Sequence, residues 1–361
     1  MKVLVCGGNG YIGSHLVREL VRTTSHSVVI VDNLSGARHH SRHHSRHHSR
    51  HHSRHSTDDS IPLEVGDIRD EAFLDRVFTV HNPDAVVHMC ASIVVSESVR
   101  DPLTYYDNNV VGSLRLLQAM ERHGCKQIVF SSTAALFGTP MRSPIEPDDT
   151  MQPESPYGDT KLVTEWMLKA ANRAHGLQYV SLRYFNACGA HDDGDIGETH
   201  DPETHLIPIV LQVPLGQRSH VTVFGSDYAT PDGTCVRDYV HISDLATAHI
   251  KALEYLQNGG TSDVFNLGSG HGYSVKEVIE VARRVTGHPI PTQEGPRREG
   301  DPPSLVASSE KAQRVLGWTR QYDSLEKIIE SAWKFHMVHP NGYQPNGHSM
   351  ETEITMRLGI S

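Results

Sequence analysis

A tyrosine and a lysine four positions apart could carry acid–base chemistry. Tyr157 and Lys161 stand near the start of an expected helix, so their side chains lie on one face and can address one site. A free phenol has a pKa near 10, and lowering that pKa by about three units takes ~4 kcal/mol of preferential phenolate stabilisation. The ammonium of Lys161 could supply part of that stabilisation. Thr133, just after an apolar run, would lie where parallel sheets build their sites. These residues predict a proton-transfer site, and the competing interpretation is an ordinary helix-start aromatic beside a solvated lysine.

A glycine-rich turn precedes the first expected helix. Gly7, Gly10 and Gly13 recur at every third position, and glycines there let the backbone approach a pyrophosphate at a helix N-terminus. Asp32 follows Gly13 by 19 residues, close to the offset at which a carboxylate binds the adenosine ribose of a dinucleotide. Because a carboxylate would repel a 2′-phosphate, the pattern favours NAD over NADP. The alternative is a glycine turn beside a solvated aspartate.

Short apolar runs alternate with helical patterns through the first half of the chain. Strands are expected at residues 2–6, 28–31, 61–65, 85–89, 127–130 and 179–182, and helices at 12–21, 103–122 and 157–175. This alternation predicts an α/β fold with a doubly wound, parallel, Rossmann-type sheet. After Asn186 the chain turns to Gly-, Pro- and Asp-rich loops. Short strands at 221–224 and 264–267 and helices near 275–285 and 325–336 predict a smaller C-terminal α/β lobe.

A repeat of His-His-Ser-Arg interrupts this pattern at residues 38–56 and contains nine of the 26 histidines. A tract without apolar residues cannot form a core, so we expect a solvated, disordered insertion. If the tract were helical, His39, His43, His47 and His51 would share a face and could chelate a transition metal.

Composition excludes several classes of protein. The balance of 33 Lys and Arg against 43 Asp and Glu gives a net charge of −10, which argues against nucleic acid as a partner. No apolar run approaches the ~18 residues that a membrane span needs. The five cysteines form no Cys-x-x-Cys pair, so we expect no disulfide framework, no metal site and a reducing cytoplasm.

Motifs along the chain resemble those of the UDP-glucose 4-epimerases, which are extended short-chain dehydrogenase/reductases. Besides the glycine turn and the Tyr157/Lys161 pair, the motifs are Asp32-Asn33-Leu34, Gly66-Asp67-Ile68, Tyr105-Tyr106-Asp107-Asn108-Asn109-Val110, Arg183-Tyr184-Phe185-Asn186, Asp195-Ile196-Gly197-Glu198, His205-Leu206-Ile207-Pro208, Val236-Arg237-Asp238-Tyr239-Val240-His241, Asn266-Leu267-Gly268, Arg297-Arg298-Glu299-Gly300-Asp301 and His339-Pro340-Asn341-Gly342-Tyr343. The resemblance covers nearly the whole chain except residues 38–56 and the tail after 343. Phe137 departs from the usual tyrosine, and Met89-Cys90-Ala91 replaces an aromatic and small residues beside the cofactor.

The resemblance implies a reaction and a set of site residues. Tyr157 would take the proton of the sugar 4-hydroxyl while hydride moves from C4 to NAD, and the resulting 4-keto sugar would turn over and be reduced again. Thr133 would share the hydrogen bond, and Lys161 would hold the cofactor ribose. The implied NAD-binding residues are Gly7, Gly10, Tyr11, Ile12, Gly13, Asp32, Asn33, Asp67, Ile68, Met89, Cys90, Ala91, Asn108, Ser131, Tyr157, Lys161 and Tyr184. The implied residues for the UDP-sugar are Thr133, Asn186, His205, Leu206, Thr222, Phe224, Arg237, Arg298, Asp301 and Leu305.

The resemblance also implies a domain layout. Residues 1–186 would bind NAD, with 236–268 packing back on them, while 187–235 and 269–343 would form the UDP-sugar lobe and 344–361 a tail. A homodimer in the cytoplasm, acting in galactose metabolism, is the expected setting.

Three other functions stay open. The first is 4-epimerisation of another UDP-sugar, such as UDP-N-acetylglucosamine, UDP-xylose or UDP-glucuronate. The second, a nucleotide-sugar dehydratase, is disfavoured because Ala134 and Ala135 follow Thr133, where related dehydratases carry Asp and Glu for water elimination. The third, a silent dinucleotide sensor, would not need the three residues of the proton-transfer site.

Overall fold

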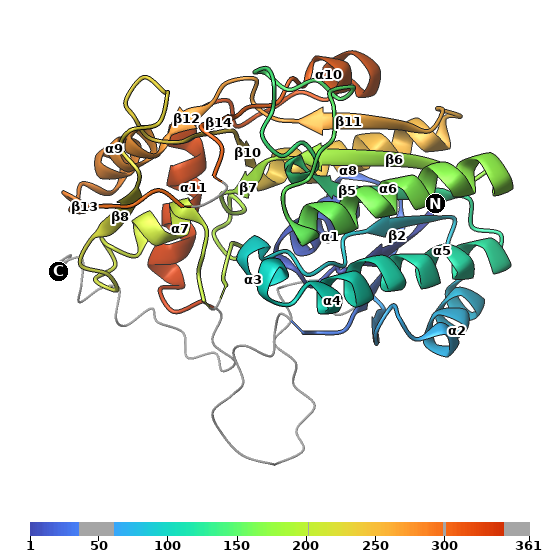
Figure 1. Ribbon diagram of the computed structural model, residues 1–361. Coiled ribbons are helices and arrows are strands. Elements are labelled where there is room, and N and C mark those ends of the chain that lie inside the picture. Colours follow the sequence, from blue (N-terminus) through green and yellow to red (C-terminus); the bar gives the residue numbers. More distant parts are fainter. Residues whose placement is uncertain (36–60, 201, 299–300, 343–361) are drawn as a thin grey trace, which may run out of the picture.

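The computed structural model describes residues 1–35, 61–200, 202–298 and 301–342. The expected insertion at 38–56 and the tail at 344–361 lie outside these ranges. A seven-stranded sheet runs through the larger part of the molecule, in the order β11-β6-β5-β4-β1-β2-β3, and every pair of neighbours is parallel (Figure 1). The predicted α/β fold with a doubly wound, Rossmann-type sheet is therefore confirmed.

The inner strands of this sheet are mostly apolar on both faces. Their bounds are β1 (Lys2–Cys6), β2 (Ser27–Asp32), β3 (Leu63–Val65), β4 (Ala85–His88), β5 (Gln127–Thr133), β6 (Gln178–Tyr184) and β11 (Asp263–Leu267). In β1, Val3 and Val5 face one hydrophobic cluster, while Leu4 and Cys6 face the other. A strand buried on both sides is apolar at most positions, which explains the nearly continuous apolar runs in the sequence.

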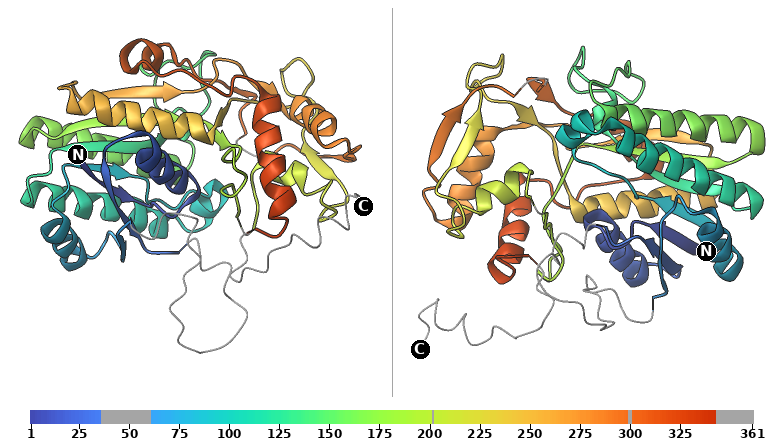
Figure 2. Two further views of the ribbon diagram at one scale, coloured as in Figure 1. Left: turned by 180° about the vertical axis from the view of Figure 1, so that it is seen from behind. Right: turned by 60° about the horizontal axis from the view of Figure 1, so that its bottom comes forward.

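Helices cover both faces of the sheet. One face is covered by α1 (Tyr11–Thr23), α8 (Ile242–Gln257) and α10 (Glu310–Leu316), and Figure 2 shows α1 and α8 in front of the sheet in its left view. The other face is covered by α2 (Glu71–His81), α5 (Gly112–Arg122) and α6 (Pro156–His175). The carboxyl ends of the parallel strands are thereby left for the loops that carry function.

A smaller lobe lies beside the sheet and has its own hydrophobic cluster (Figure 1). Its helices are α7 (Leu206–Leu211), α9 (Val275–Thr286) and α11 (Leu325–Val338). Its short strands are β7 (Asn186–Cys188), β8 (Val221–Phe224), β9 (Val236–Arg237), β10 (Tyr239–His241), β12 (Tyr273–Ser274), β13 (Thr292–Gly295) and β14 (Ser304–Leu305). They pair as β7 with β10, β8 with β13, and β9 between β12 and β14.

The chain passes repeatedly between the sheet and this lobe. It leaves the sheet after β6, returns with α8 and β11, leaves again with β12 and α9, returns with α10 and ends the described part in α11. The domain boundaries expected from the sequence stay a prediction. Among the described residues, no helix has the length and apolarity to span a membrane.

The expected helix over residues 103–122 is divided into three pieces. Helix α4 (Pro102–Tyr105) is followed by a π-helical stretch (Tyr106–Val111) and then by α5. Within that stretch the Asn109 side chain accepts a hydrogen bond from the Ser92 backbone N–H and donates to Thr160 Oγ1. The wider π-turn lets Asn109 make these contacts, which a local hydrophobic pattern does not encode. The sequence pattern does not give bounds for α2, α3 (Val95–Arg100), α7, α8 and α10.

Candidate active site

The glycine turn joins β1 to α1 in a conformation that only small residues allow. Gly7 has φ +88°, and a Cβ built on Gly13 would lie 2.1 Å from the Gly7 carbonyl oxygen. Gly10 precedes α1 as its N-cap, and no side chain caps that end of the helix. The turn therefore brings backbone close to backbone at a helix N-terminus, which is the arrangement that binds a pyrophosphate.

Asp32 lies at the end of β2 with its carboxylate turned toward the glycine turn. It accepts hydrogen bonds from the backbone N–H of Asn9 (3.0 Å) and of Leu34 (2.8 Å). Burial raises the pKa of Asp32, and the two backbone hydrogen bonds offset only part of that effect. Two N–H groups thus hold the carboxylate in place beside the turn.

The other predicted NAD-binding residues line the carboxyl ends of the neighbouring strands. A Cβ on Gly7 would lie 3.0 Å from the Cys90 backbone nitrogen, so the segment Met89–Cys90–Ala91 passes directly against the turn. Asp67 accepts hydrogen bonds from the Arg69 guanidinium, and these bonds are the main reason why the pKa of Asp67 is lowered. Arg69 also pairs with Asp107 (2.5 Å). Ile68 is buried. Asn108 donates a hydrogen bond to Ser92 Oγ at 3.2 Å.

Tyr157, Thr133 and Lys161 come together at the ends of β5 and α6. Burial raises the pKa of Tyr157, and a hydrogen bond with Thr133 offsets part of that rise. Lys161 is buried, its Nζ donates to the Ser131 carbonyl oxygen at 2.9 Å, and it lies 6.0 Å from the centre of the Tyr157 ring. Burial lowers the pKa of Lys161 to about 8. The phenol and the ammonium therefore address one site, as their spacing predicts.

Buried polar side chains contact Ser131, whose carbonyl oxygen binds Lys161. Ser131 Oγ lies 2.9 Å from His249 Nε2, and His249 is in turn bonded to the Leu245 carbonyl oxygen at 2.8 Å. Tyr184 lies beside this pair, and burial raises its pKa. The sequence pattern does not indicate His249, because α8 reaches Ser131 only through the tertiary fold.

Residues expected to hold the UDP-sugar gather at the smaller lobe. Arg237 on β9 forms an ion pair with Asp301, and the Arg298 guanidinium lies 4.2 Å from the centre of the Phe224 ring. Leu305 on β14 is the register partner of Arg237. A cavity of about 410 Å³ is lined by Thr139, Tyr228, Arg297, Arg298, Asp301, Pro302 and Pro303. It contains Arg298 and Asp301 from the expected set and does not include Tyr157.

The remaining expected substrate residues lie at element boundaries. Asn186 begins β7, and its side-chain amide donates to the Asp238 carbonyl oxygen at 2.7 Å. Leu206 begins α7 with His205 as its N-cap, and Thr222 lies in β8. The His205 imidazole contacts the buried Glu198 carboxylate. Burial alone would raise the pKa of Glu198, but His200 and His205 lower it to about 2.

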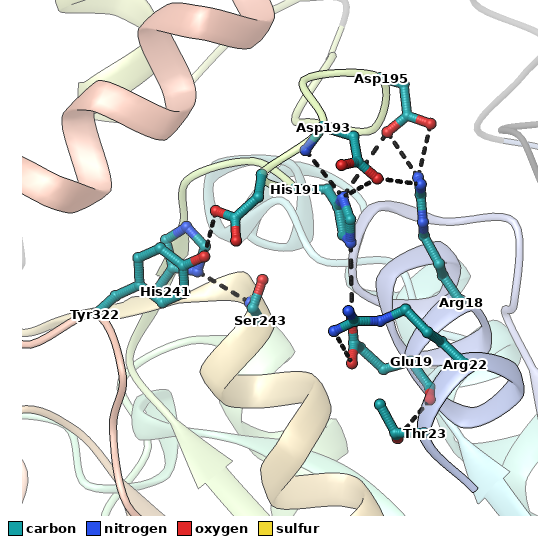
Figure 3. A network of polar contacts seen from close by, with 11 residues as sticks. Arg18, Glu19, Arg22, Thr23, His191, Asp193, Asp195, His241, Ser243 and Tyr322 are labelled. Carbon is teal, nitrogen blue, oxygen red and sulfur yellow. Dashed lines mark hydrogen bonds and ion pairs between the residues drawn. The ribbon is translucent and has the colours of Figure 1, made fainter.

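A polar network joins α1 to the segment after β7, and Figure 3 shows it from close by. Arg18 binds Asp193 and Asp195, each at 2.6 Å, and the His191 imidazole lies 3.7 Å from Glu19. Tyr11 contributes a further link, because its hydroxyl donates to the Gly189 carbonyl oxygen at 2.7 Å. The glycine turn and the smaller lobe are therefore connected through polar side chains.

The residues present fit a dinucleotide cofactor. The glycine turn leaves room that a Cβ would fill, and Asp32 stands beside it with a fixed carboxylate. Lys161 and Tyr157 lie at the end of β5, two strands away from β1 in the same sheet. The order of strands therefore allows one extended molecule to lie across the carboxyl ends from Asp32 to Tyr157.

Comparison with known proteins gives consistent matches. A model of the NAD dependent epimerase/dehydratase family matches residues 3–268. The UDP-glucose 4-epimerase of Halalkalibacterium halodurans is 52% identical over 343 residues, covering 95% of this chain and 98% of that relative. The UDP-glucose 4-epimerase of Lacticaseibacillus casei is 49% identical, covering 95% and 99%.

Solved structures match as well. One crystal structure of a UDP-glucose 4-epimerase superposes with a TM-score of 0.88 at 47% identity, covering 95% of this chain and all of that one. The Bifidobacterium longum enzyme, solved in complex with NAD⁺ and UDP, gives a TM-score of 0.84 at 37% identity, with the same coverage. Sequence and structure together show that this chain belongs to the NAD dependent epimerase/dehydratase family.

Proposed function

We propose that the protein interconverts UDP-glucose and UDP-galactose by inverting C4 of the sugar. The observation that carries this proposal is the meeting of Tyr157, Thr133 and Lys161 at the end of β5, in the same sheet as the glycine turn and Asp32. Relatives that share about half of the sequence over nearly its whole length are UDP-glucose 4-epimerases. Their names support this substrate class.

The cofactor in this proposal is NAD. The glycine turn would receive its pyrophosphate, Asp32 the adenosine ribose and Lys161 the ribose next to the nicotinamide. When bound, NAD supplies the hydride acceptor and donor for C4 and a positive charge near the phenol.

Tyr157 is the proposed acid–base residue. Its hydroxyl oxygen takes the proton from the sugar 4-hydroxyl as C4 becomes a ketone, and it returns that proton to O4 after the ketone has turned over. Thr133 shares the hydrogen bond at the phenol. Because burial raises the pKa of Tyr157, the charge of Lys161 and of the cofactor must lower it for proton transfer at neutral pH.

The UDP group would be held by the smaller lobe while the sugar turns. Arg237 and Arg298 would bind the diphosphate through charge-assisted hydrogen bonds, and Asp301 would accept from the uridine ribose. Asn186, His205, Leu206, Thr222, Phe224 and Leu305 complete the proposed substrate set.

We further propose a cytoplasmic homodimer that serves galactose metabolism. Three apolar side chains on neighbouring helices support the dimer, because Val99, Leu103 and Trp166 are 62%, 78% and 57% exposed. These residues lie on α3, α4 and α6, which pack against one another, and apolar side chains exposed together on a surface mark protein interfaces. The scattered free cysteines fit a reducing compartment.

The test is a coupled assay over a panel of UDP-sugars with purified wild type and Tyr157→Phe. Wild type should convert UDP-galactose to UDP-glucose, and the variant should keep its NAD but lose ~10²- to 10⁴-fold in rate, the usual worth of a positioned acid–base group. Tyr255→Phe is a matched control, since that hydroxyl contacts Thr261 away from the site. Variant turnover within twofold of wild type would remove Tyr157 from the mechanism.

The same panel separates epimerisation from dehydration. Ala134 and Ala135 form the short turn after Thr133, and neither side chain can transfer a proton to drive water elimination. Accumulation of a dehydrated 4-keto sugar would favour the dehydratase alternative.

A further inference from the structure

Two histidines and two glutamates converge just before α7. They are Glu198, His200, Glu203 and His205, and one donor atom from each lies within 4.8 Å of the other three. His200 Nδ1 lies 3.3 Å from Glu198 Oε1 and 3.7 Å from Glu203 Oε2, and His205 Nδ1 lies 3.9 Å from Glu203 Oε1. In a tetrahedral zinc site with bonds of about 2.1 Å, donor atoms are about 3.4 Å apart. These three spacings are close to that value, whereas His205 Nδ1 and Glu198 Oε1 are in direct contact and would have to separate around an ion.

The His200 ring points to a missing ligand. Its Nδ1 atom is buried and has no hydrogen-bond partner among the residues that the structure describes, although Glu198 Oε1 is 3.3 Å away. Buried polar atoms are almost always satisfied, so a buried ring nitrogen without a partner needs an explanation. A metal ion between His200 and the two carboxylates would satisfy it.

The charge of the buried glutamates also indicates a bound cation. The side chains of Glu198 and Glu203 are 3% and 5% exposed, and within the described ranges their recorded ion-pair partners are His200 and His205 alone. Protonated imidazoles would balance the two carboxylates in the absence of an ion; as neutral metal ligands they leave a charge of −2, which one divalent cation neutralises. Buried carboxylates require such compensation.

A second cluster of histidine and carboxylate side chains already has a cationic partner. His191, Asp193 and Asp195 also lie within 4.8 Å of one another, but Arg18 binds both aspartates at 2.6 Å (Figure 3). A guanidinium already neutralises that cluster, and a cation there would be repelled. The cluster at Glu198 has no recorded arginine or lysine partner in the described part of the chain.

We propose that Glu198, His200, Glu203 and His205 form a binding site for one divalent transition-metal ion, with Zn²⁺ as its natural occupant. Imidazole and carboxylate donors in this number suit zinc, whereas Ca²⁺ and Mg²⁺ prefer oxygen donors alone. The ion would fasten the segment before α7 and is not part of the proposed hydride chemistry. The site was not expected from the sequence.

The test uses the full-length protein with its NAD, stripped with a chelator and titrated with Co²⁺, because tetrahedral Co²⁺ absorbs visible light far more strongly than octahedral Co²⁺. Wild type should gain the tetrahedral band with one equivalent, and Zn²⁺ should remove it. His200→Gln should lose the band. His200→Cys should restore binding and add a near-ultraviolet thiolate-to-cobalt band, whereas the matched control His220→Cys should not add it.

Each outcome decides the proposal. All these proteins keep the His-His-Ser-Arg tract, so metal bound there contributes equally and cancels in the comparison. A wild-type titration without the tetrahedral band would overturn the site even if the variants failed to fold. A band that persists in His200→Gln, or a missing thiolate band in His200→Cys, would also overturn it.

Discussion

Burial moves the pKa values of Tyr157 and Lys161 away from one another. The pKa of Lys161 falls to about 8 and the pKa of Tyr157 rises. The phenol therefore holds its proton more firmly than the ammonium group of Lys161 holds its own. The sequence spacing predicts that the two side chains meet. It cannot predict this shift, which depends on strands β4 and β5 covering Lys161 from positions far along the chain.

We predict that Leu305 determines how broad the substrate range is. By resemblance, a tyrosine at this position restricts these enzymes to UDP-glucose and UDP-galactose, and leucine leaves more room beside Arg237. We predict measurable but lower activity on UDP-N-acetylglucosamine than on UDP-glucose. Leu305→Tyr should reduce the N-acetyl activity selectively, by ~10- to 200-fold in kcat/KM, the usual worth of a steric filter of one or two carbons.

The comparison needs both substrates in both proteins, with Leu305→Met as a volume-conserving control. The solved UDP-Glc/GlcNAc 4-epimerase of Campylobacter jejuni, 36% identical with a TM-score of 0.77, provides a positive reference for the assay. Equal losses on the two sugars in Leu305→Tyr would show that Leu305 supports the fold and does not select the substrate.

Other residues of the site could not be found from local sequence. Asn109 makes its hydrogen bonds from a π-helical turn, and the contact between His249 and Ser131 depends on where α8 packs. The Glu-x-His-x-x-Glu-x-His spacing at 198–205 is a signal that could have indicated a metal site. These intervals do not place all four side chains on one helical face, so periodicity alone does not indicate the site.

At the level of elements, the main sheet was predictable, whereas in the smaller lobe only β8, α9 and α11 were. Strands β1, β2 and β4 are nearly continuous apolar runs and β5 and β6 contain shorter ones, and the alternation of these strands with helices indicates a parallel sheet. In contrast, β9 and β14 have two residues each and pair across a long stretch of sequence. Elements so short carry no periodicity, so only the folded chain reveals them.

A buried ion pair joins three neighbouring elements of the large domain. Arg183 on β6 binds Glu165 on α6 (2.6 Å), and Ser132 on β5 donates to the same carboxylate (2.6 Å). Removing the arginine would leave a buried carboxylate unpaired. We predict that Arg183→Met lowers the free energy of unfolding by ~3–5 kcal/mol, measured by denaturant titration.

Two further variants test that interpretation. Glu165→Gln/Arg183→Met should be more stable than Arg183→Met alone, because the uncompensated charge is gone. Arg142→Met, which removes an exposed pair with Asp149, should cost at most ~1 kcal/mol. If both arginine variants lost the same stability, burial of the pair would not be the cause.

For the whole molecule, three buried histidines make folding sensitive to acid. Burial lowers the pKa values of His88 and His241 to about 3 and of His249 to about 4, against 6.5 for an exposed histidine. Between pH 6.5 and 4.5 the unfolded chain binds protons at these rings and the folded chain does not. Stability should therefore fall as the pH falls through this window, by up to ~1.4 kcal/mol per pH unit for each ring.

Denaturant titrations at pH 6.5 and 5.0 measure this effect. His249→Gln removes one of the three rings while leaving an amide that can contact Ser131, so its loss of stability over this interval should be smaller by roughly 1–2 kcal/mol. The prediction fails if wild type and variant lose the same free energy.

The His-His-Ser-Arg tract should be dispensable. It begins beyond Asp32, lacks apolar residues and lies outside the described part of the structure. We predict that deleting residues 39–54 leaves NAD retention and turnover within about twofold of wild type, since polar insertions in connecting loops carry little folding energy. Loss of NAD on purification of the deletion variant would assign the tract to the cofactor site.

The repeated passage of the chain between the sheet and the smaller lobe limits how such a protein can be recombined. Exchanging the lobe for that of a relative requires junctions after β6, before α8, after β11 and on both sides of α10. At each of these points the chain passes between the sheet and the lobe. A single crossover would leave α8 or β11 beside a foreign neighbour. New specificity in this architecture should therefore arise by substitutions and loop insertions within one lineage, and chimaeras joined at one point should fail to fold.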